Sequence, residues 1–321
     1  MTDTLHADMQ KAVRLLADAR SVTLLSHVQP DADTIGSALA LAIALDRRGV
    51  TTQVSFGAPA QLPESMIGLP GLQFLTPPEQ VRADADLVVT VDAGSRGRLG
   101  RLGVLLDGAV SLVIDHHRSN TFYGTHHVVD ASAESTTAVV AALFDEWGVD
   151  IDAELAHCLF AGLVTDTGSF RWVRPGSHTL AERLLATGID GAAISRRLLD
   201  THPFAWLPML GSVLGSARLI PSAADGLGLV CAIVRLDDSR GLRPEEIESV
   251  VDIVRTTAEA EVAAVFKQNA EGWAVSLRAK SEVDVSVVAT ALGGGGHRLS
   301  AGYTATGDIE DDIDALVAAL G

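Results

Sequence analysis

The chain has 321 residues, a hydrophobic content of 47% and a formal net charge of −17. This length is sufficient for two domains, and the hydrophobic fraction is sufficient for substantial cores. A surface this acidic disfavours long nucleic acid duplexes, whose binding normally requires several Lys or Arg contacts to phosphates. Small anionic substrates remain compatible with the charge if metal ions and a few arginines form a local positive pocket.

No apolar run reaches the roughly 20 residues that span a bilayer, and the mean hydropathy is only +0.26. Residues 1–10 are polar and mixed in charge, without the basic and then apolar pattern of a signal peptide. We therefore expect a cytoplasmic protein without a membrane partner. Cys158 and Cys231 lie in apolar surroundings, so we expect buried free thiols rather than a zinc site or a disulfide.

The first part of the chain alternates strand-like and helix-like runs. The predicted strands are 21–26, 52–56, 86–91 and 110–114. The predicted helices are 34–48, 136–147 and 153–164, followed by two helices between 181 and 199. Continuous apolar strands separated by helices indicate a parallel sheet that is covered on both faces. In such sheets, ligands bind beyond the carboxyl ends of the strands.

The rest of the chain predicts a second, smaller domain of mixed α/β type. A linker is predicted over 204–218, where a helix could run despite Pro208 and two glycines. The predicted strands that follow are 228–235, 261–268 and 272–278, and the predicted helices are 244–255 and 283–292. The fold class is therefore α/β, with a parallel-sheet domain over 1–203 and the smaller domain over 219–321.

Four short segments rich in aspartate and histidine each follow an apolar, strand-like run. They are 26–33, 91–95, 114–117 and 164–169. Carboxylates that gather at buried strand ends repel each other and lose hydration, which costs several kcal/mol unless something compensates them. A pair of divalent cations is the simplest compensation. The pattern therefore predicts a two-metal hydrolase of phosphate esters.

The first segment predicts ligands to two neighbouring ions. The spacing allows His27 and Asp31 to face one ion and directs Asp33 to the other. The helix that follows begins near Thr34, and its N-terminal dipole also favours negative charge. The alternative is that Asp31 only caps this helix, which is a common role for aspartate. The presence of the other three segments favours the metal hypothesis.

The other segments complete the predicted site. Asp92 is suited to bridge two cations, and Asp166 follows another apolar run. Because adjacent histidines in an extended segment point in opposite directions, we assign His116 to a metal and His117 to the substrate phosphate. Asp115 is then expected to fix the tautomer of a histidine ring.

Oxygen ligands combined with two histidines favour Mn²⁺, with Mg²⁺ or Co²⁺ as substitutes. Two such ions would generate a nucleophile from water at neutral pH and stabilise charge on the phosphoryl oxygens. Arg118, directly after the double histidine, is a further candidate for contact with substrate phosphate.

A run of four glycines predicts a second phosphate site in the C-terminal part. Backbone N–H groups of Gly294, Gly295 and Gly296 could approach an anion closely, because glycine lacks a side chain. The alternative is a flexible loop. The nearby His297 and Arg278 favour phosphate binding.

These motifs resemble those of the DHH phosphoesterase superfamily. The resemblance rests on the pattern Ser26-His27-x-x-Pro30-Asp31-x-Asp33-x-x-Gly36-Ser37, on Asp92, on Asp115-His116-His117 and on Asp166. The segments Ser276-Leu277-Arg278 and 293–302 resemble the associated DHHA1 domain, with Leu299 as a departure from its usual small or basic residue. The resemblance covers nearly the whole chain and points to the group with oligoribonuclease (nanoRNase), 3′-phosphoadenosine 5′-phosphate (pAp) phosphatase and cyclic-di-AMP phosphodiesterase activities.

The resemblance also implies roles for individual residues. One metal ion would be held by His27, Asp31 and Asp92, and the other by Asp33, Asp92, His116 and Asp166. His117 would contact the scissile phosphate. A second, terminal phosphate would be held by Arg278, the backbone of Gly294 to Gly296, His297 and Ser300.

We therefore predict a Mn²⁺-dependent phosphodiesterase for cyclic di-AMP, linear pApA and other very short oligoribonucleotides, with possible activity on pAp. A family II inorganic pyrophosphatase shares the metal motifs, but the glycine run with His297 argues against it. A long single-strand exonuclease would need a more basic surface. A nucleotide-sensing module without catalysis is the remaining alternative, and a homodimer is plausible.

Overall fold

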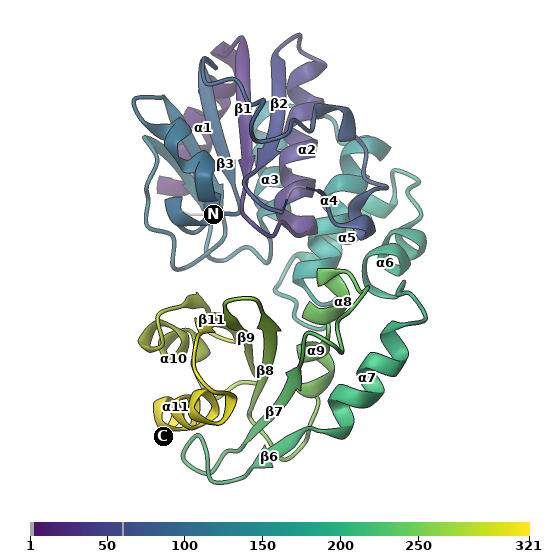
Figure 1. Cartoon of the computed structure of the whole chain (residues 1–321). Helices are drawn as coiled ribbons and strands as arrows, with labels where there is room; N and C mark the ends of the chain where they lie inside the picture. Colours follow the sequence, from purple (N-terminus) through teal and green to yellow (C-terminus); the bar gives the residue numbers. More distant parts are fainter. Residues whose placement is uncertain (1–2, 60) are drawn as a thin grey trace. The chain divides into compact units, whose positions relative to one another are not determined.

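The computed structural model describes residues 3–59 and 61–321, which divide into one compact unit up to Thr201 and a second from His202 (Figure 1). Each unit has its own sheet and its own hydrophobic core. Cys158 and Cys231 are buried and free, as expected. Within the described ranges, no helix combines the length and the apolar character that a membrane crossing requires.

The first unit contains a five-stranded sheet in the order β2-β1-β3-β4-β5, and every neighbouring pair is parallel. The strands are β1 (Ser21–Ser26), β2 (Thr51–Phe56), β3 (Leu87–Val91), β4 (Ser111–Asp115) and β5 (His126–Val129). The predicted parallel sheet is thus confirmed. The edge strand β5 was not predicted, because it is only four residues long and begins with two histidines.

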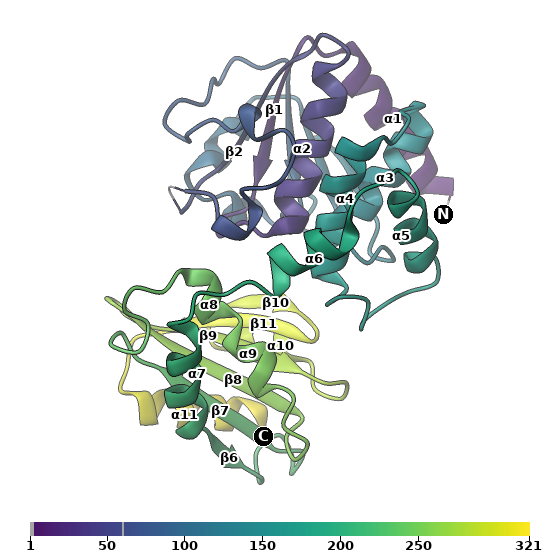
Figure 2. The same ribbon diagram turned by 90° about the vertical axis from the view of Figure 1, so that its right-hand side faces the viewer.

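α-Helices cover one face of this sheet: the first three in chain order contact the strands, and the last three pack on other helices. They are α1 (Asp3–Asp18), α2 (Ala32–Asp46), α3 (Thr136–Trp147), α4 (Ala153–Asp166), α5 (Ser177–Leu185) and α6 (Gly191–Leu199). All residues of α2 up to Leu45 are buried, because the helix lies between the strands and α4 (Figure 2). A helix that is apolar on all sides requires such a fully enclosed position.

The second face of the sheet is covered in a different way. Successive side chains alternate between the faces, so that Leu24 packs with the helices whereas Leu25 packs on the opposite side. There it contacts the segment η3 (Arg96–Leu106), a stretch of 3₁₀ turns interrupted at Gly100. Two shorter 3₁₀ turns, η1 (Glu64–Met66) and η2 (Leu72–Phe74), lie between β2 and β3. Both faces are covered, as predicted, but only one of them by α-helices.

The second unit contains a mixed sheet in the order β10-β11-β9-β8-β7-β6, in which only β7 and β8 are parallel. Its strands are β6 (Arg218–Ile220), β7 (Leu229–Val234), β8 (Val262–Asn269), β9 (Gly272–Ala279), β10 (Gly295–His297) and β11 (Ser300–Ala305). Its helices are α7 (Trp206–Gly215), α8 (Pro244–Glu248), α9 (Val250–Val254), α10 (Val285–Ala291) and α11 (Ile309–Leu320). The predicted smaller α/β domain has this mixed architecture.

The segment predicted as a linker contains the whole of α7. Its side chains Met209, Leu210 and Val213 are buried in one cluster with β7, β8 and α9. The opposite face of the sheet packs against α10 and α11. Residues 204–218 therefore contribute to the core of the second unit and do not form a free connection.

Candidate metal centre

The predicted metal ligands of the first unit converge at one edge of its sheet. His27 directly follows β1, Asp92 directly follows β3, and Asp115 is the last residue of β4. Parallel strands bring their carboxyl ends to the same edge, which explains the convergence. Asp166 differs from the expected pattern, because it is the last residue of the helix α4 and does not follow a strand.

Candidate ligand atoms within 4.8 Å of one another form three groups in this unit. The groups are His27 with Asp31 and Asp92, Asp33 with Asp92 and His116, and Asp92 with Asp115 and His117. Asp92 belongs to all three. The described part of the first unit thus contains acidic and histidine clusters that could bind metal ions.

Asp92 lies at the centre of the site and is 4% exposed. Its Oδ2 is 3.3 Å from Nε2 of His27, and its Oδ1 is 3.6 Å from Nε2 of His116. Oδ1 also accepts a hydrogen bond of 2.9 Å from the hydroxyl of Thr136. The backbone of Asp92 is left-handed (φ +57°), which is uncommon for a residue other than glycine and typical of functional positions. Oδ2 of Asp92 thus faces His27, whereas Oδ1 faces His116 and also lies 3.5 Å from Nδ1 of His117.

His27 is held with Nε2 toward the carboxylates. Its Nδ1 lies 2.9 Å from the carbonyl of Val28, so the ring donates there and Nε2 carries the lone pair that a metal ion would use. Burial lowers the pKa of His27, but the carboxylates of Asp31 and Asp92 outweigh burial and raise the pKa to about 10. The nitrogen is thus surrounded by negative charge.

Asp31 combines the two roles that the sequence left open. Its Oδ1 caps α2 by accepting hydrogen bonds from the backbone N–H groups of Asp33 (3.1 Å) and Thr34 (3.0 Å). Its Oδ2 lies 3.5 Å from Nε2 of His27. One carboxylate can therefore hold the helix start and still present an oxygen to an ion.

Asp33 and Asp166 are carboxyl groups whose ionised form is destabilised by their surroundings. Asp33 is buried and accepts hydrogen bonds from the backbone N–H groups of Thr136 (2.6 Å) and Thr137 (2.8 Å) in the first turn of α3. Burial, followed by the charges of nearby aspartates, raises the pKa of both Asp33 and Asp166 well above the usual range. A divalent cation would offset this repulsion, so the donor set fits a metal centre.

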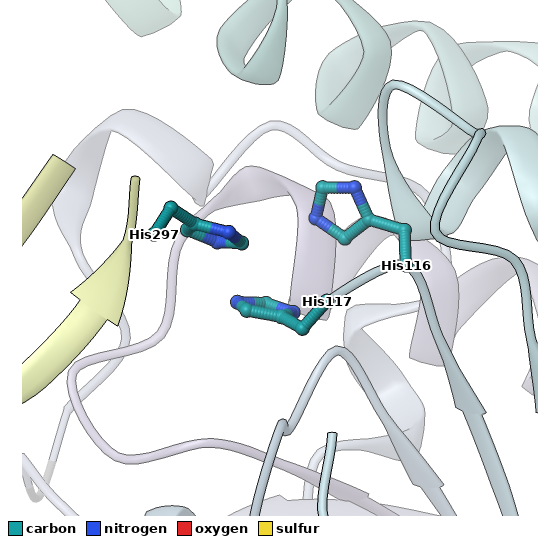
Figure 3. A group of neighbouring side chains, drawn as sticks. All are labelled: His116, His117 and His297. Carbon is teal, nitrogen blue, oxygen red and sulfur yellow. The ribbon is translucent and has the colours of Figure 1, made fainter. Parts of the chain in front are cut away.

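The sequence predicts that the adjacent His116 and His117 point in opposite directions, but their rings lie close together on the same side of the segment (Figure 3). Their centroids are 4.9 Å apart and their planes are inclined by 77°. Nε2 of His116 (3.6 Å) and Nδ1 of His117 (3.5 Å) both approach Oδ1 of Asp92. Nδ1 of His116 donates to the carbonyl of Ala133 (3.4 Å), and Nε2 faces Oδ2 of Asp166 at 3.3 Å. Nδ1 of His117 instead donates to Oδ1 of Asp115 at 2.7 Å.

Asp115 is fully buried, and its oxygens accept hydrogen bonds from residues of its own segment. Its Oδ1 accepts the backbone N–H groups of His116 (2.8 Å) and His117 (3.2 Å), and its Oδ2 accepts the amide of Asn120 (2.5 Å). Burial lowers the pKa of His117, but the hydrogen bond to Asp115 and the negative charges of Asp92 and Asp115 together outweigh burial and raise the pKa. These contacts favour an orienting role for Asp115 over metal ligation.

Two arginines at the site were not predicted. Nη2 of Arg98, in η3, lies 3.3 Å from Nδ1 of His27. Arg174 donates through Nη1 to the carbonyls of Ala131 (2.8 Å) and Ala133 (3.0 Å), and the latter also accepts from His116. Neither arginine has a diagnostic spacing, because each reaches the site through a loop. Arg118, which was predicted, is exposed next to His117.

The residues predicted to bind a second phosphate lie in the second unit. Arg278 on β9 pairs with Ser300 on β11, and Ser300 pairs with His297 on β10. Because directly paired residues of antiparallel strands face the same side, the three side chains share one face of the sheet. Nη1 of Arg278 donates to the carbonyl of Leu277 (3.1 Å), and Nε lies 3.6 Å from Oδ1 of Asp252.

The glycine run has a structural explanation that the sequence did not indicate. It forms the start of β10, and two of its members lie against β11. A Cβ at Gly294 would lie 2.1 Å from the carbonyl oxygen of Gly302, and one at Gly296 would lie 2.5 Å from Cα of Ala301. A Cβ at Gly295 would meet nothing within 4 Å. Gly294 and Gly296 are thus required by the neighbouring strand, whereas Gly295 is free of close packing, as is Gly293 before the strand.

Both units match known families. Residues 21–163 match the profile of the "DHH family, N-terminal domain", and residues 227–321 match the "DHHA1 domain". The bifunctional oligoribonuclease and PAP phosphatase NrnA of Thermus thermophilus is 30% identical over 302 residues, which cover 93% of this chain and 89% of NrnA.

Two further similarities extend over almost the whole chain. The cyclic-di-AMP phosphodiesterase GdpP of Bacillus subtilis is 25% identical over 329 residues, 95% of this chain but 48% of GdpP. An exopolyphosphatase-related protein from Bacteroides fragilis has a solved structure with a TM-score of 0.88 and 22% identity, covering 98% of this chain and 95% of that one. At this identity, the structural likeness supports the fold alone.

Proposed function

Because the chain belongs to the DHH phosphoesterase family and carries a DHHA1 domain after its DHH domain, we propose that it is a Mn²⁺-dependent phosphodiesterase for very short nucleotides. The observation that carries this proposal is the position of Asp92, whose two oxygens face His27 and His116 separately. A carboxylate in this position suits a bridge between two cations.

The proposed ligands of the two ions follow the contacts around Asp92. One ion takes His27, Asp31 and Asp92, and the other takes Asp33, Asp92, His116 and Asp166. Carboxylates with only two imidazoles and no thiolate favour Mn²⁺, with Mg²⁺ or Co²⁺ as substitutes. When bound, the ions lower the pKa of water to supply the nucleophile and stabilise phosphoryl charge.

The side chains of the first unit perform the remaining steps. His117 contacts the scissile phosphate and, when protonated, donates a hydrogen bond to an oxygen that gains charge in the transition state. Asp115 keeps Nδ1 of His117 protonated and leaves Nε2 for the substrate. Arg118, exposed next to His117, is a further phosphate contact.

The second unit binds a phosphate of the same substrate at one face of its sheet. Arg278 and His297 supply positive charge, Ser300 supplies a hydroxyl, and Gly295 supplies an open backbone. The packing of Gly294 and Gly296 keeps this short strand in place. Two anchored phosphates would select short nucleotides over long strands, which agrees with the net charge of −17.

The proposed substrates are cyclic di-AMP, linear pApA, other very short oligoribonucleotides and pAp. The names of the relatives NrnA and GdpP support this set. The test is kcat/KM for each of these nucleotides and for pyrophosphate, under identical Mn²⁺ and with EDTA as control. Turnover of a dinucleotide with Mn²⁺ and its loss with EDTA support the proposal. Turnover of pyrophosphate alone, or binding of nucleotides without hydrolysis, contradicts it.

The Asp92→Asn variant tests the bridging role. We expect it to lose bound Mn²⁺ and at least about a hundredfold in kcat/KM, because both ions lose a ligand. Asp107→Asn is the control, since Asp107 pairs with Arg96 (2.6 Å) at the end of η3. Full turnover by Asp92→Asn would rule out the proposed centre. The plausible homodimer stays a prediction, which light scattering on the purified protein would test.

A further inference from the structure

Arg98 is fixed beside the turn that follows β1. Its carbonyl accepts the backbone N–H of Val28 at 2.8 Å. Two residues later, Gly100 is left-handed (φ +56°), and a Cβ there would lie 2.7 Å from Cγ1 of Val28. Because η3 is held against this turn, the backbone of Arg98 has a defined position, and this limits where its guanidinium group can lie.

The side chain of Arg98 reaches His27 but pairs with no carboxylate among the described residues. The two other arginines of η3 each form an ion pair. Arg96 pairs with Asp107 at 2.6 Å, and Arg101 pairs with Glu79 at 3.1 Å. Arg98 is exposed, and its Nη2 lies 3.3 Å from Nδ1 of His27. The charge of Arg98 helps to lower the pKa of Asp31, which places its guanidinium group near the aspartates, but the group forms no ion pair with them and keeps N–H donors for a further anion.

The hydrogen-bonding capacity of His27 strengthens this argument. Nδ1 lies within reach of both the carbonyl of Val28 (2.9 Å) and Nη2 of Arg98 (3.3 Å). The carbonyl requires a proton on Nδ1, whereas the guanidinium requires a lone pair there, so the two bonds exclude each other. A ring that offers Nε2 to a cation keeps its proton on Nδ1 and donates to Val28. The N–H groups of Arg98 then need another acceptor.

We propose that Arg98 binds a non-bridging phosphate oxygen of the substrate beside the ion held by His27, Asp31 and Asp92. This inference rests on the proposed function of the same site. The ligand class is a phosphate oxyanion, for which a guanidinium group supplies charge and paired N–H donors. In a partly buried site, such a donor stabilises the charge that develops on the phosphoryl oxygens.

The test compares Arg98→Gln, Arg98→Ala, Arg98→Lys and Arg96→Gln in the Mn²⁺-loaded full chain. For a hydrolysed dinucleotide, we expect Arg98→Gln to lose about 10²- to 10³-fold in kcat/KM. Arg98→Lys should recover part of the loss, because it restores charge without the planar fork. Arg96→Gln is the matched control from the same segment and should keep wild-type kcat/KM. Added guanidinium should partly restore the activity of Arg98→Ala but not that of a variant whose fold is damaged.

A binding measurement separates this inference from the proposed function. Inorganic phosphate is titrated into each Mn²⁺-loaded variant by calorimetry, which requires no turnover. We expect about tenfold weaker phosphate binding in Arg98→Gln with unchanged Mn²⁺ stoichiometry. If no nucleotide is hydrolysed, the proposed function fails, and phosphate binding still decides the role of Arg98. Unchanged phosphate affinity in Arg98→Gln, or loss of Mn²⁺ along with it, overturns the inference, because Arg98 would then be inert or would only support His27.

Discussion

Nδ1 of His117 donates a hydrogen bond of 2.7 Å to Oδ1 of Asp115, a carboxylate that is fully buried. The same oxygen accepts the backbone N–H groups of His116 and His117, and the second oxygen accepts from Asn120. The carboxylate therefore sets both the ring orientation and the proton position of His117. It also holds the turn that carries the two histidines.

We predict that Asp115→Asn lowers kcat about 10²- to 10⁴-fold, because His117 loses the partner that fixes its tautomer. The stoichiometry of bound Mn²⁺ should remain that of the wild type, since Asp115 faces His117 and not the proposed ions. Steady-state kinetics and metal analysis of the purified variant measure both quantities. Loss of Mn²⁺ in equal measure would identify Asp115 as a ligand and contradict the orienting role.

Arg174 connects two loops of the candidate metal centre. Its Nη1 donates to the carbonyls of Ala131 and Ala133, and Ala133 also accepts from Nδ1 of His116. We predict that Arg174→Gln weakens Mn²⁺ binding about 10- to 100-fold, the usual effect of losing a group that orients a ligand. Arg171→Gln, an exposed residue of the same loop, is the control. Equal Mn²⁺ affinities in the two variants would contradict the prediction.

The sequence predicts much of the metal centre because a general rule of parallel sheets connects distant segments. His27, Asp92 and Asp115 each end or follow an apolar strand, so they had to meet at one edge. Asp31 shows the limit of this reasoning. Its two oxygens serve a helix cap and His27 separately, and the spacing alone offers these roles as alternatives.

Contacts made through loops could not be predicted. Arg98 follows Asp92 closely in sequence but reaches His27 only because η3 turns back over the sheet. The glycine run was attributed to anion binding, yet Gly294 and Gly296 are required by β11, whose pairing with β10 was not expected. The three-residue strands β6 and β10 were missed because they are too short to give an apolar pattern.

Two variants in the glycine run can distinguish a packing role from a role in phosphate binding. We predict that Gly294→Ala lowers the stability of the chain by about 1–3 kcal/mol, because its Cβ would overlap the backbone of Gly302. Gly295→Ala meets open space and should retain the melting temperature. If substrate phosphate approaches Gly295, this variant should show a raised KM instead. Equal melting temperatures for the two variants would contradict the packing explanation.

We predict that Glu246 makes a contribution to the stability of the second unit that is lost in acid. Its side chain is fully buried and accepts hydrogen bonds from the backbone N–H (2.9 Å) and Nε (2.9 Å) of Arg243. Burial raises the pKa of Glu246, but the hydrogen bonds from Arg243 outweigh burial and lower it. A pKa that is lower in the folded state stabilises the fold above the unfolded value of about 4.3. This stabilisation is lost as the pH falls from there through the folded pKa.

We therefore expect Glu246→Gln to cost about 1–3 kcal/mol of unfolding free energy at pH 7, because Arg243 keeps a partner that lacks charge. The difference from the wild type should shrink below about pH 4, where the wild-type carboxylate also loses its charge. Glu271→Gln, at an exposed position, is the control and should follow the wild type at every pH. Urea unfolding of the three proteins from pH 7 down to pH 3 measures these differences. If the difference in unfolding free energy between wild type and Glu246→Gln grew toward acid, the pKa of Glu246 would not be lowered in the folded state. Arg243 would then not stabilise the ionised form of Glu246.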